Sequence, residues 1–308
     1  MNSTFSDRPD TGGRHDSFSW TSAPRVKPAA MKDRDAFEAA MRHPRYPRSS
    51  AYCPDWVFQN SMGGPINLWL TEELAEPMEL SPGQRVLDLG CGSATSSIFL
   101  GREFGVEVWA SDLWIDPHGN RQRIAEAGLD RSVFALSAEA HRLPFARGFF
   151  DAVVSVDAYH YFGTEVRYLS YLSQFLRPGG RIGIVVPANA IDPDEPGAVA
   201  PRPDLAGEIG ADWYSFRSPG WWYRHWSRTP AIAVEAAEMI EGGLADWQRT
   251  LDATRAHYGL LPGETEFDGR MLDDEAARTL GFCLVVGRRR EDAPNPFFGP
   301  GEYETRIA

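Results

Sequence analysis

The sequence predicts an α/β protein built on a mostly parallel β-sheet with helices on both faces. Short apolar segments of the kind that a parallel sheet buries alternate along the chain with segments of helical periodicity. This alternation is typical of strands joined by crossover helices, and such folds bind their ligands at the carboxyl ends of the strands. A glycine turn between the first strand and its helix marks the best-defined of these ends.

That turn lies within the stretch 86–95, which reads VLDLGCGSAT. Its opening residues form an apolar strand, and Gly90 and Gly92 permit a tight turn and a close approach of the backbone to a ligand. Asp88 lies inside the apolar strand, where a charge is costly unless it meets a ligand or a partner. A glycine turn of this kind at the start of a helix indicates a nucleotide site.

The helix after the turn and the strand that follows it narrow the choice of ligand. Ser93 or Thr95 is expected to cap this helix, which ends at Gly105. Thr95 also occupies the place of the third glycine in the G-x-G-x-x-G dinucleotide pattern, so that pattern is incomplete. The segment 106–112 reads as a second strand that ends in Asp112, where an acidic side chain can accept hydrogen bonds from a ribose.

The remaining elements are predicted from apolar periodicity and from glycine and proline breakers. The first is a helix that begins at Pro65 and ends near Pro77, with Ile66, Trp69, Leu70 and Leu74 on one face. It is followed by a helix at 120–127 and by strands at 132–136 and 149–156. A helix at 165–176 comes next and is broken by Pro178, Gly179 and Gly180. Then follow a strand at 181–186 stopped by Pro187, a long loop at 188–217, a helix capped by Ser218 with Pro219 in its first turn, a strand at 231–240, a helix at 244–258 and a last strand at 281–288.

Composition and charge argue against several classes of protein. The chain has 308 residues with 31 Lys and Arg against 43 Asp and Glu, a formal net charge of −12, so we expect no nucleic-acid partner. Its cysteines, Cys53, Cys91 and Cys283, are far apart and match no zinc pattern, so no metal site is predicted. The absence of an apolar leader and of a long apolar run predicts a soluble cytoplasmic protein without a membrane partner.

Taken together, these motifs resemble the class I S-adenosylmethionine-dependent methyltransferases of the small-molecule type. The resemblance rests on V-L-D-L-G-C-G at 86–92, the acidic end of the second strand, E-A-x-x-L-P-F at 139–145 and L-R-P-G-G at 176–180. It covers residues 84–187 well and the remainder loosely. It implies a Rossmann-like sheet of seven strands with the last strand antiparallel, N-terminal helices, an inserted lid, and S-adenosyl-L-methionine as cofactor.

On this basis the chain divides into six segments. They are a mostly disordered tail at 1–45, a helical cap at 46–84, the S-adenosylmethionine-binding core at 85–187, a lid or substrate segment with a helix at 188–230, C-terminal strands with an inserted helix at 231–290, and a tail at 291–308.

The resemblance also implies which residues hold the cofactor. The turn formed by Gly90, Cys91, Gly92 and Ser93 would lie against the methionine moiety, with the helix N-terminus favouring its carboxylate. Asp88 would face the ammonium group, Asp112 the ribose hydroxyls and Leu113 the adenine. The site would continue through Ala138, Glu139, Ala140 and Asp157, with Glu139 standing where the family usually has Asp. The alternative for the three carboxylates Asp88, Asp112 and Glu139 is a structural role, as a capping or solvated group.

The candidate catalytic residues follow the fourth strand. The stretch 157–162, DAYHYF, resembles the family's x-x-x-L-H-H-F at the mouth of the methyl-transfer site. His160 is a candidate general base because an imidazole titrates near neutrality, and the alternative is a structural or substrate-orienting role. Tyr159 is the second candidate, by contact with the acceptor, and Asp157 could hold the imidazole tautomer. No N-P-P-Y or D-P-P-Y motif follows this strand, which argues against methylation of DNA bases.

Aromatic residues crowd the segment 213–226. They are Trp213, Tyr214, Phe216, Trp221, Trp222, Tyr223 and Trp226. Trp222 and Trp226 have the spacing of a helix face that packs on a sheet, whereas Trp213, Tyr214 and Trp221 are candidates for a lid over a planar or apolar acceptor. His118 and His225 are expected at the surface.

The sequence thus predicts an enzyme that transfers the methyl group of S-adenosylmethionine to a small-molecule acceptor. His160 favours O- or N-methylation, with C-methylation open. Two alternatives remain at this point: a nicotinamide-dependent oxidoreductase on a Rossmann fold, against which Asp88 and Thr95 argue, and a non-methylating S-adenosylmethionine-binding protein.

Overall fold

The structure is a computed structural model that describes residues 34–61, 64–258 and 269–292. The described chain forms a seven-stranded sheet in the order β3-β2-β1-β4-β5-β7-β6. The strands are β1 (Arg85–Leu89), β2 (Glu107–Asp112), β3 (Val133–Ser137), β4 (Phe150–Val156), β5 (Leu176–Asn189), β6 (Ile232–Met239) and β7 (Leu280–Arg289). Strands β1 to β5 are parallel and β7 runs antiparallel between β5 and β6. This confirms the predicted Rossmann-like fold.

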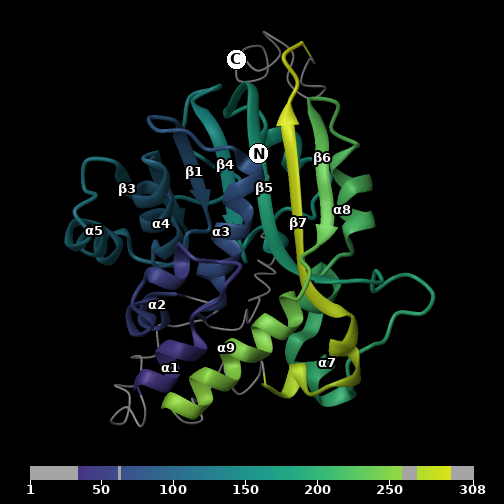
Figure 1. The fold of residues 1–308 in the computed structure, drawn as a ribbon. Coiled ribbons are helices and arrows are strands. Elements are labelled where there is room, and N and C mark those ends of the chain that lie inside the picture. The colour runs from purple at the N-terminus through teal and green to yellow at the C-terminus, as the bar shows by residue number, and fades with distance from the viewer. Residues whose placement is uncertain (1–33, 62–63, 259–268, 293–308) are drawn as a thin grey trace, which may run out of the picture.

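Helices cover both faces of the sheet (Figure 1). They are α1 (Arg34–Ala40), α2 (Pro54–Asn60), α3 (Ile66–Met78), α4 (Thr95–Phe104), α5 (Pro117–Glu126), α6 (Tyr168–Leu172), α7 (Pro203–Ile209), α8 (Pro219–Trp226) and α9 (Gly243–Tyr258). Short 3-10 helices are η1 (Ser49–Ala51), η2 (Tyr159–Tyr161), η3 (Gly210–Ser215) and η4 (Glu275–Thr279).

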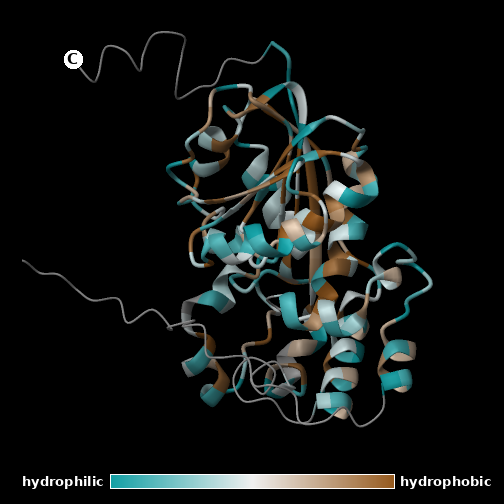
Figure 2. Ribbon diagram, turned by 90° about the vertical axis from the view of Figure 1, so that its left-hand side faces the viewer, coloured by the Kyte–Doolittle hydropathy of each residue, from teal (hydrophilic) through white to brown (hydrophobic). Residues whose placement is uncertain are grey.

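Two apolar cores lie on opposite faces of the sheet because alternate residues of a strand point to opposite sides. One core contains the buried side chains of α3 and α4, and the other contains those of α6 and α8. Trp222 and Trp226 of α8 are completely buried in the second core, as their spacing predicted. Figure 2 shows hydrophobic strands through the centre of the molecule and hydrophilic residues on the outer helices.

A group of helices lies beyond the carboxyl ends of the parallel strands. In Figure 1, α1, α2, α7 and α9 lie below the sheet, where β1, β4 and β5 end. Residues 34–40, which the sequence analysis placed in a disordered tail, form α1, and this helix packs against α9. Residues 1–33 of that tail and residues 293–308 of the C-terminal tail lie outside the described residues. The edge of the sheet where ligands are expected is therefore covered by α1, α2, α7 and α9.

Strand β5 is longer than predicted and the helix before it is shorter. The predicted helix at 165–176 is the short α6, and β5 continues through Pro178 and Pro187, although the sequence predicts a break at both. Pro187 is tolerated because of the side to which its nitrogen points. The Asn189 N–H, two residues further along, donates to Phe216 O on the side away from β7, and alternate residues of a strand point to the same side, so the Pro187 nitrogen also faces away from β7. On that side β4 has already ended, because its last pair with β5 is Val156 with Val185. Proline therefore costs no hydrogen bond of the sheet at this position.

The predicted long loop at 188–217 contains regular structure. Its first residues belong to β5, and α7 and η3 occupy its second half. Helix α8 begins as predicted, because Ser218 accepts a hydrogen bond from the Trp221 N–H and Pro219 follows it.

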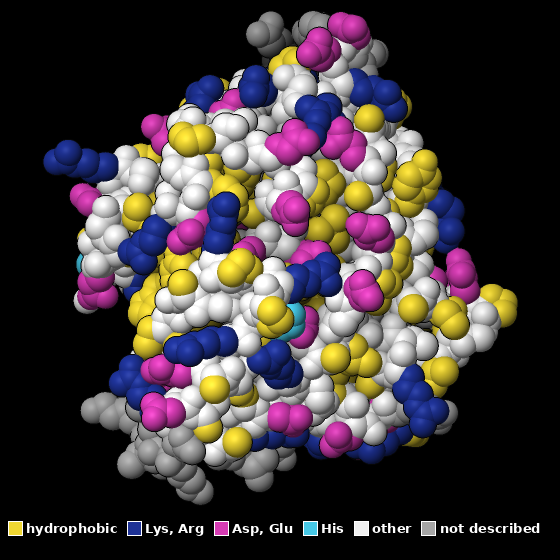
Figure 3. All heavy atoms as spheres, viewed as in Figure 1, with side chains coloured by type: hydrophobic (Ala, Val, Ile, Leu, Met, Phe, Trp, Pro, Cys, Tyr) yellow, Lys and Arg dark blue, Asp and Glu magenta, His cyan; other side chains and the backbone are white. Residues whose placement is uncertain are grey.

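The surface seen in Figure 3 carries interspersed acidic and basic side chains with hydrophobic ones between them. Among the described residues, every helix is too short or too polar to span a lipid bilayer.

Candidate active site at the carboxyl edge of the sheet

The glycine loop after β1 adopts a conformation that its sequence requires. Gly90 has φ 77° and a Cβ at this position would lie 2.4 Å from Ala158 Cβ, so only glycine fits between the ends of β1 and β4. Gly92 and Ala94 also have positive φ values, 52° and 63°. The predicted cap by Ser93 or Thr95 is wrong, since Ala94 precedes α4 and no side chain caps the helix.

Asp112 lies at the end of β2 and binds the loop directly. Its Oδ2 accepts a hydrogen bond of 2.9 Å from the Gly92 N–H. Its Oδ1 accepts from the N–H groups of Trp114 and Ile115 at 2.8 and 3.0 Å. Because a carboxylate oxygen has room for more than one donor, Oδ2 can still accept from a ligand hydroxyl. Leu113, predicted to contact adenine, is 55% exposed beside this carboxylate.

Asp88 is buried beneath the glycine loop. Its Oδ2 accepts hydrogen bonds of 2.6 Å from the hydroxyls of Ser96 and Ser97 in α4, and its Oδ1 has no hydrogen-bond partner. Burial raises the pKa of the Asp88 carboxyl from 3.8 to about 6, against the two serine hydroxyls, which lower it. Asp88 is therefore a buried carboxylate with one oxygen that lacks a hydrogen-bond partner.

The end of β3 lies next to Asp112, since the Ala138 N–H donates to Asp112 O at 3.1 Å. The Glu139 carboxylate accepts two hydrogen bonds from His141: one of 3.0 Å from the backbone N–H and one of 2.7 Å from the ring Nδ1. These bonds lower the pKa of Glu139 in spite of its partial burial, which raises it. Ala140 O accepts from the Tyr168 hydroxyl at 3.2 Å. The fold thus brings the predicted segment 138–140 beside Asp112, with Glu139 ionised.

The first turn after β4 holds Asp157 and His160. Asp157 has a positive φ of 55° and accepts a hydrogen bond of 3.2 Å from the Asn67 side chain of α3. Sequence reasoning missed Asn67, because in the sequence it is only a polar residue next to the apolar face of its helix.

His160 is 2% exposed, and its ring centroid lies 4.0 Å from that of Tyr161 and 5.6 Å from that of Phe216. Burial lowers the pKa of His160 from 6.5 to about 3, so the imidazole is neutral at pH 7.

Tyr159 lies on the other side of the same turn and points into the core. It is fully buried among Phe162, Tyr168, Trp222 and Trp226. Burial raises the pKa of its hydroxyl well above 10. The structure therefore does not bring Tyr159 together with His160 at the strand ends, and its position is that of a packing residue.

The aromatic segment 213–226 divides between site and core. Trp213 and Phe216 are buried, and Phe216 contacts His160, whereas Tyr214 is 55% exposed. Trp221 stacks on His225 with ring centroids 4.3 Å apart. The prediction that His225 lies at the surface is wrong: its ring is buried and bonded to Gly163 O at 3.1 Å, whereas His118 is exposed as expected.

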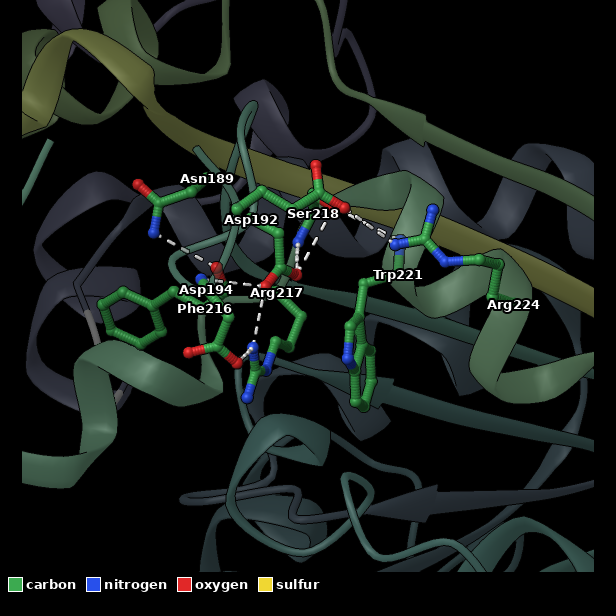
Figure 4. A network of polar contacts seen from close by, with 9 residues as sticks. Asn189, Asp192, Asp194, Phe216, Arg217, Ser218, Trp221 and Arg224 are labelled. Carbon is green, nitrogen blue, oxygen red and sulfur yellow. Dashed lines mark hydrogen bonds and ion pairs between the residues drawn. The ribbon is translucent and has the colours of Figure 1, made fainter. Parts of the chain in front are cut away.

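A network of polar contacts joins the two ends of the segment 188–217 (Figure 4). Asp192 is 2% exposed and its Oδ1 accepts a hydrogen bond of 2.7 Å from Arg217. Its Oδ2 accepts from the Ser218 N–H at 3.3 Å, and Asn189 donates to Phe216 O at 3.1 Å. The network fixes Phe216, and with it the wall of the site next to His160.

Comparisons with known proteins place this geometry in a family. The methyltransferase domain family matches residues 86–180, which include the glycine loop, Asp112 and His160. The 27-O-demethylrifamycin SV methyltransferase of Amycolatopsis mediterranei (strain S699) is 30% identical over 246 residues, which cover 71% of this chain and 82% of that protein. The chain belongs to the class I S-adenosylmethionine-dependent methyltransferases. It spans only 42% and 33% of the length of two other curated relatives.

Solved structures agree on the fold of this methyltransferase. Geranyl diphosphate C-methyltransferase from Streptomyces coelicolor A3(2) aligns with a TM-score of 0.60 at 16% identity, covering 82% of this chain and 84% of that one. The [4+2]-cyclase SpnF aligns with a TM-score of 0.56 at 18% identity, covering 72% of this chain and 81% of that one. At these identities the likeness concerns the fold alone.

The residues of this methyltransferase fit S-adenosylmethionine, which carries a sulfonium and an ammonium group. Asp88 and Asp112 form no ion pair with any described residue, and Asp88 Oδ1 is a buried oxygen without a partner. Such carboxylates suit a cationic ligand. The glycine loop offers backbone N–H groups at the start of α4 for the ligand's carboxylate.

Two surface cavities of the methyltransferase lie elsewhere. One of about 660 Å³ lies between α1 and α9, and one of about 560 Å³ lies between α2, α4 and α5. Neither is lined by the glycine loop or by His160. The strand-end site is instead identified by its polar side chains.

Proposed function

We propose that this protein transfers a methyl group from S-adenosylmethionine to a small-molecule acceptor. The observation that carries the proposal is the convergence of four strand ends: the glycine loop after β1, Asp112 at the end of β2, Glu139 after β3 and the Asp157–His160 turn after β4. In a parallel sheet these ends form one ligand site.

The cofactor would supply an activated methyl group, because its positively charged sulfur leaves as a neutral thioether when the methyl group is transferred. The protein's contribution is to hold donor and acceptor close and in line, which is worth roughly 7–11 kcal/mol. In this chain Asp112 would accept from the ribose hydroxyls and the glycine loop would bind the carboxylate. Phe216 and Trp213, both buried, exclude water beside His160.

The state of His160 bears on the acceptor. A neutral imidazole can donate one hydrogen bond and accept another, so it can orient a hydroxyl or an amino group. With a pKa of about 3, His160 is a weak base, which supports the orienting role over that of a general base. We therefore propose O- or N-methylation, with His160 as the residue that orients the acceptor.

Family membership decides against the nicotinamide-dependent alternative. A cofactor-binding protein that transfers no methyl group is the second candidate, because a fold does not fix the chemistry and SpnF, of similar fold, is described as a cyclase. The formal charge of −12 argues against a nucleic-acid partner, and we further propose that the enzyme is cytoplasmic.

One experiment separates these functions. The protein is incubated with methyl-labelled S-adenosylmethionine and a metabolite extract, and labelled products are identified by mass spectrometry. Transfer of label to a small molecule supports the proposal. Binding of the cofactor by calorimetry without any labelled product, across extracts of several compositions, would favour the non-methylating alternative.

A further inference from the structure

Helix α5 holds the glycine loop through side chains that no motif singled out. Asn120 is 1% exposed and its Nδ2 donates a hydrogen bond of 2.9 Å to Gly92 O. Arg123, one turn further along the same helix face, donates from Nε to Ser93 O at 3.0 Å and from Nη2 to Asn120 Oδ1 at 2.5 Å. Asn120 and Arg123 thus form a clamp on two consecutive carbonyl groups of the loop.

The clamp acts together with Asp112 on a single residue. Gly92 has its N–H bound by Asp112 and its C=O bound by Asn120, so both peptide planes that meet at Gly92 are fixed. Without these bonds the backbone of a glycine with φ 52° has many other conformations open to it. The clamp therefore selects one conformation of the loop.

The orientation of the peptide planes determines which groups face the ligand. In a trans peptide the C=O and the next N–H point in opposite directions. Because Gly92 O points to Asn120 of α5, the Ser93 N–H points away from α5, and none of the described residues accepts a hydrogen bond from it. This N–H lies just before α4, where the helix dipole favours an anionic group.

We propose that Asn120 and Arg123 are positioning residues that hold the glycine loop in its ligand-binding conformation and tune its affinity for the carboxylate of the cofactor. The inference rests on the proposed function, because it takes S-adenosylmethionine as the ligand. It adds residues of α5 that touch neither the cofactor nor the acceptor and act through Gly92 and Ser93.

The test compares Arg123→Ala with Arg121→Ala, a matched control that removes an exposed arginine from the same helix. Dissociation constants are measured by calorimetry for S-adenosylmethionine and for decarboxylated S-adenosylmethionine, which lacks only the carboxylate. Arg123→Ala should weaken S-adenosylmethionine about tenfold or more, as expected for the loss of charge-assisted hydrogen bonds, and decarboxylated S-adenosylmethionine about twofold or less. Arg121→Ala should change neither constant.

Arg123→Lys serves as the rescue variant, since a lysine ammonium can bond to Ser93 O or to Asn120 Oδ1 but lacks the fork that reaches both. It should restore part of the lost affinity. A merely structural role would weaken both ligands equally, and that result, or unchanged affinity in Arg123→Ala, would overturn the inference. If the wild-type protein bound neither ligand, the proposed function itself would fail instead.

A second measurement needs no ligand. Hydrogen exchange of the amides at 91–94 should be faster in Arg123→Ala than in the wild type, while exchange in the interior of α4 should be unchanged. Equal exchange rates at 91–94 in the two proteins would contradict the clamp.

Discussion

The Gly92 N–H donates a hydrogen bond of 2.9 Å to the carboxylate of Asp112, across 20 positions of sequence. The glycine loop and the end of β2 are therefore one unit before any ligand binds. Sequence reasoning assigned the two residues separate contacts with the cofactor. The structure gives Asp112 a structural role in addition to the proposed ligand role, so its removal has two separable effects.

Replacement of Asp112 by alanine should weaken S-adenosylmethionine binding by roughly 1.5–3 kcal/mol, because an ionised acceptor of hydroxyl groups is lost. It should also lower the melting temperature of the free protein, because three backbone N–H groups lose their acceptor. Calorimetry and thermal unfolding measure the two effects. Asp130→Ala, at an exposed position, is the control. A variant that binds the cofactor with wild-type affinity, on the order of micromolar, would refute the ligand role.

The raised pKa of Asp88 predicts a trade-off between stability and binding. The folded state holds the Asp88 proton up to about pH 6, whereas the unfolded state releases it near pH 3.8. The folded state therefore binds more protons between these values, and this group makes the protein less stable as the pH rises from about 3.8 to about 6. Asp88→Asn removes the effect and should stabilise the protein at pH 7.5 by roughly 1–3 kcal/mol.

The same variant should bind S-adenosylmethionine more weakly, since an asparagine side chain carries no charge to meet the ammonium group. In the wild type, affinity should rise as the pH increases through about 6, because a cation favours the ionised carboxylate. Thermal unfolding and calorimetry between pH 5 and pH 8 would measure both trends. Equal stability of the two proteins at every pH would show that the buried charge of Asp88 does not destabilise the fold.

We expect limited proteolysis to cut only part of the segment that follows β5. The Asp192–Arg217 bond and the Asn189–Phe216 bond close its base, and α7 and η3 order its second half, so we expect cleavage to concentrate at 193–201. Subtilisin is a suitable protease, because Pro196 follows Glu195 and Pro203 follows Arg202, which hinders enzymes specific for acidic or basic residues.

Cleavage of this segment should slow when cofactor and acceptor are both bound, and Arg217→Ala should be cut faster than the wild type at additional sites. Arg224→Ala, which removes only the exposed pair with Glu195, is the control and should leave the pattern nearly unchanged. A cleavage rate that is insensitive to both ligands would identify the segment as an ordinary surface loop.

The fold could be predicted where the local sequence decides the structure. The glycine turn, the alternating apolar segments and the Ser218–Pro219 cap are local signals, and the structure confirms them. Strand β5 could not be delimited, because pairing with β7, nearly a hundred residues away, overrides the breaker signal of Pro187, and because Pro178 lies in an irregularity of the β4–β5 pairing. Long-range pairing is invisible to a pattern read over a short window.

The site shows the same limit. Asp88 lies near the end of β1, Asp112 ends β2 and Glu139 follows β3, so all three could be placed at one edge from the sequence. Their partners come from distant helices: Asn67 from α3 on Asp157, and Asn120 from α5 on Gly92. No spacing rule links these pairs. Ala94 likewise adopts a positive φ because the loop is fixed by its contacts, although alanine has no local preference for it.

The role of His160 is decided by its environment as much as by its residue type. Sequence reasoning expected a group that titrates near neutrality, but burial lowers the pKa of His160 to about 3, so the imidazole takes up no proton between pH 5 and pH 8. The unfolded chain does take one up as the pH falls through 6.5, and folding stability should therefore fall in that direction. His160 should therefore contribute no inflection near pH 6.5 to the pH–rate profile of the wild type. Any inflection seen there should also be present in His160 variants.

With the acceptor found by the labelled-methyl screen, His160→Ala should raise the acceptor KM about tenfold and leave the affinity for S-adenosylmethionine nearly intact, because the lost hydrogen bond orients the acceptor. His160→Gln, which keeps a neutral donor and acceptor, should recover most of this loss, and His118→Ala, at an exposed position, should behave as the wild type. A general base would give another result: kcat falls by ~10²–10⁴-fold and glutamine does not restore it. A purely structural histidine would lower stability and cofactor affinity together, so steady-state kinetics, calorimetry and thermal unfolding on these variants separate the three roles.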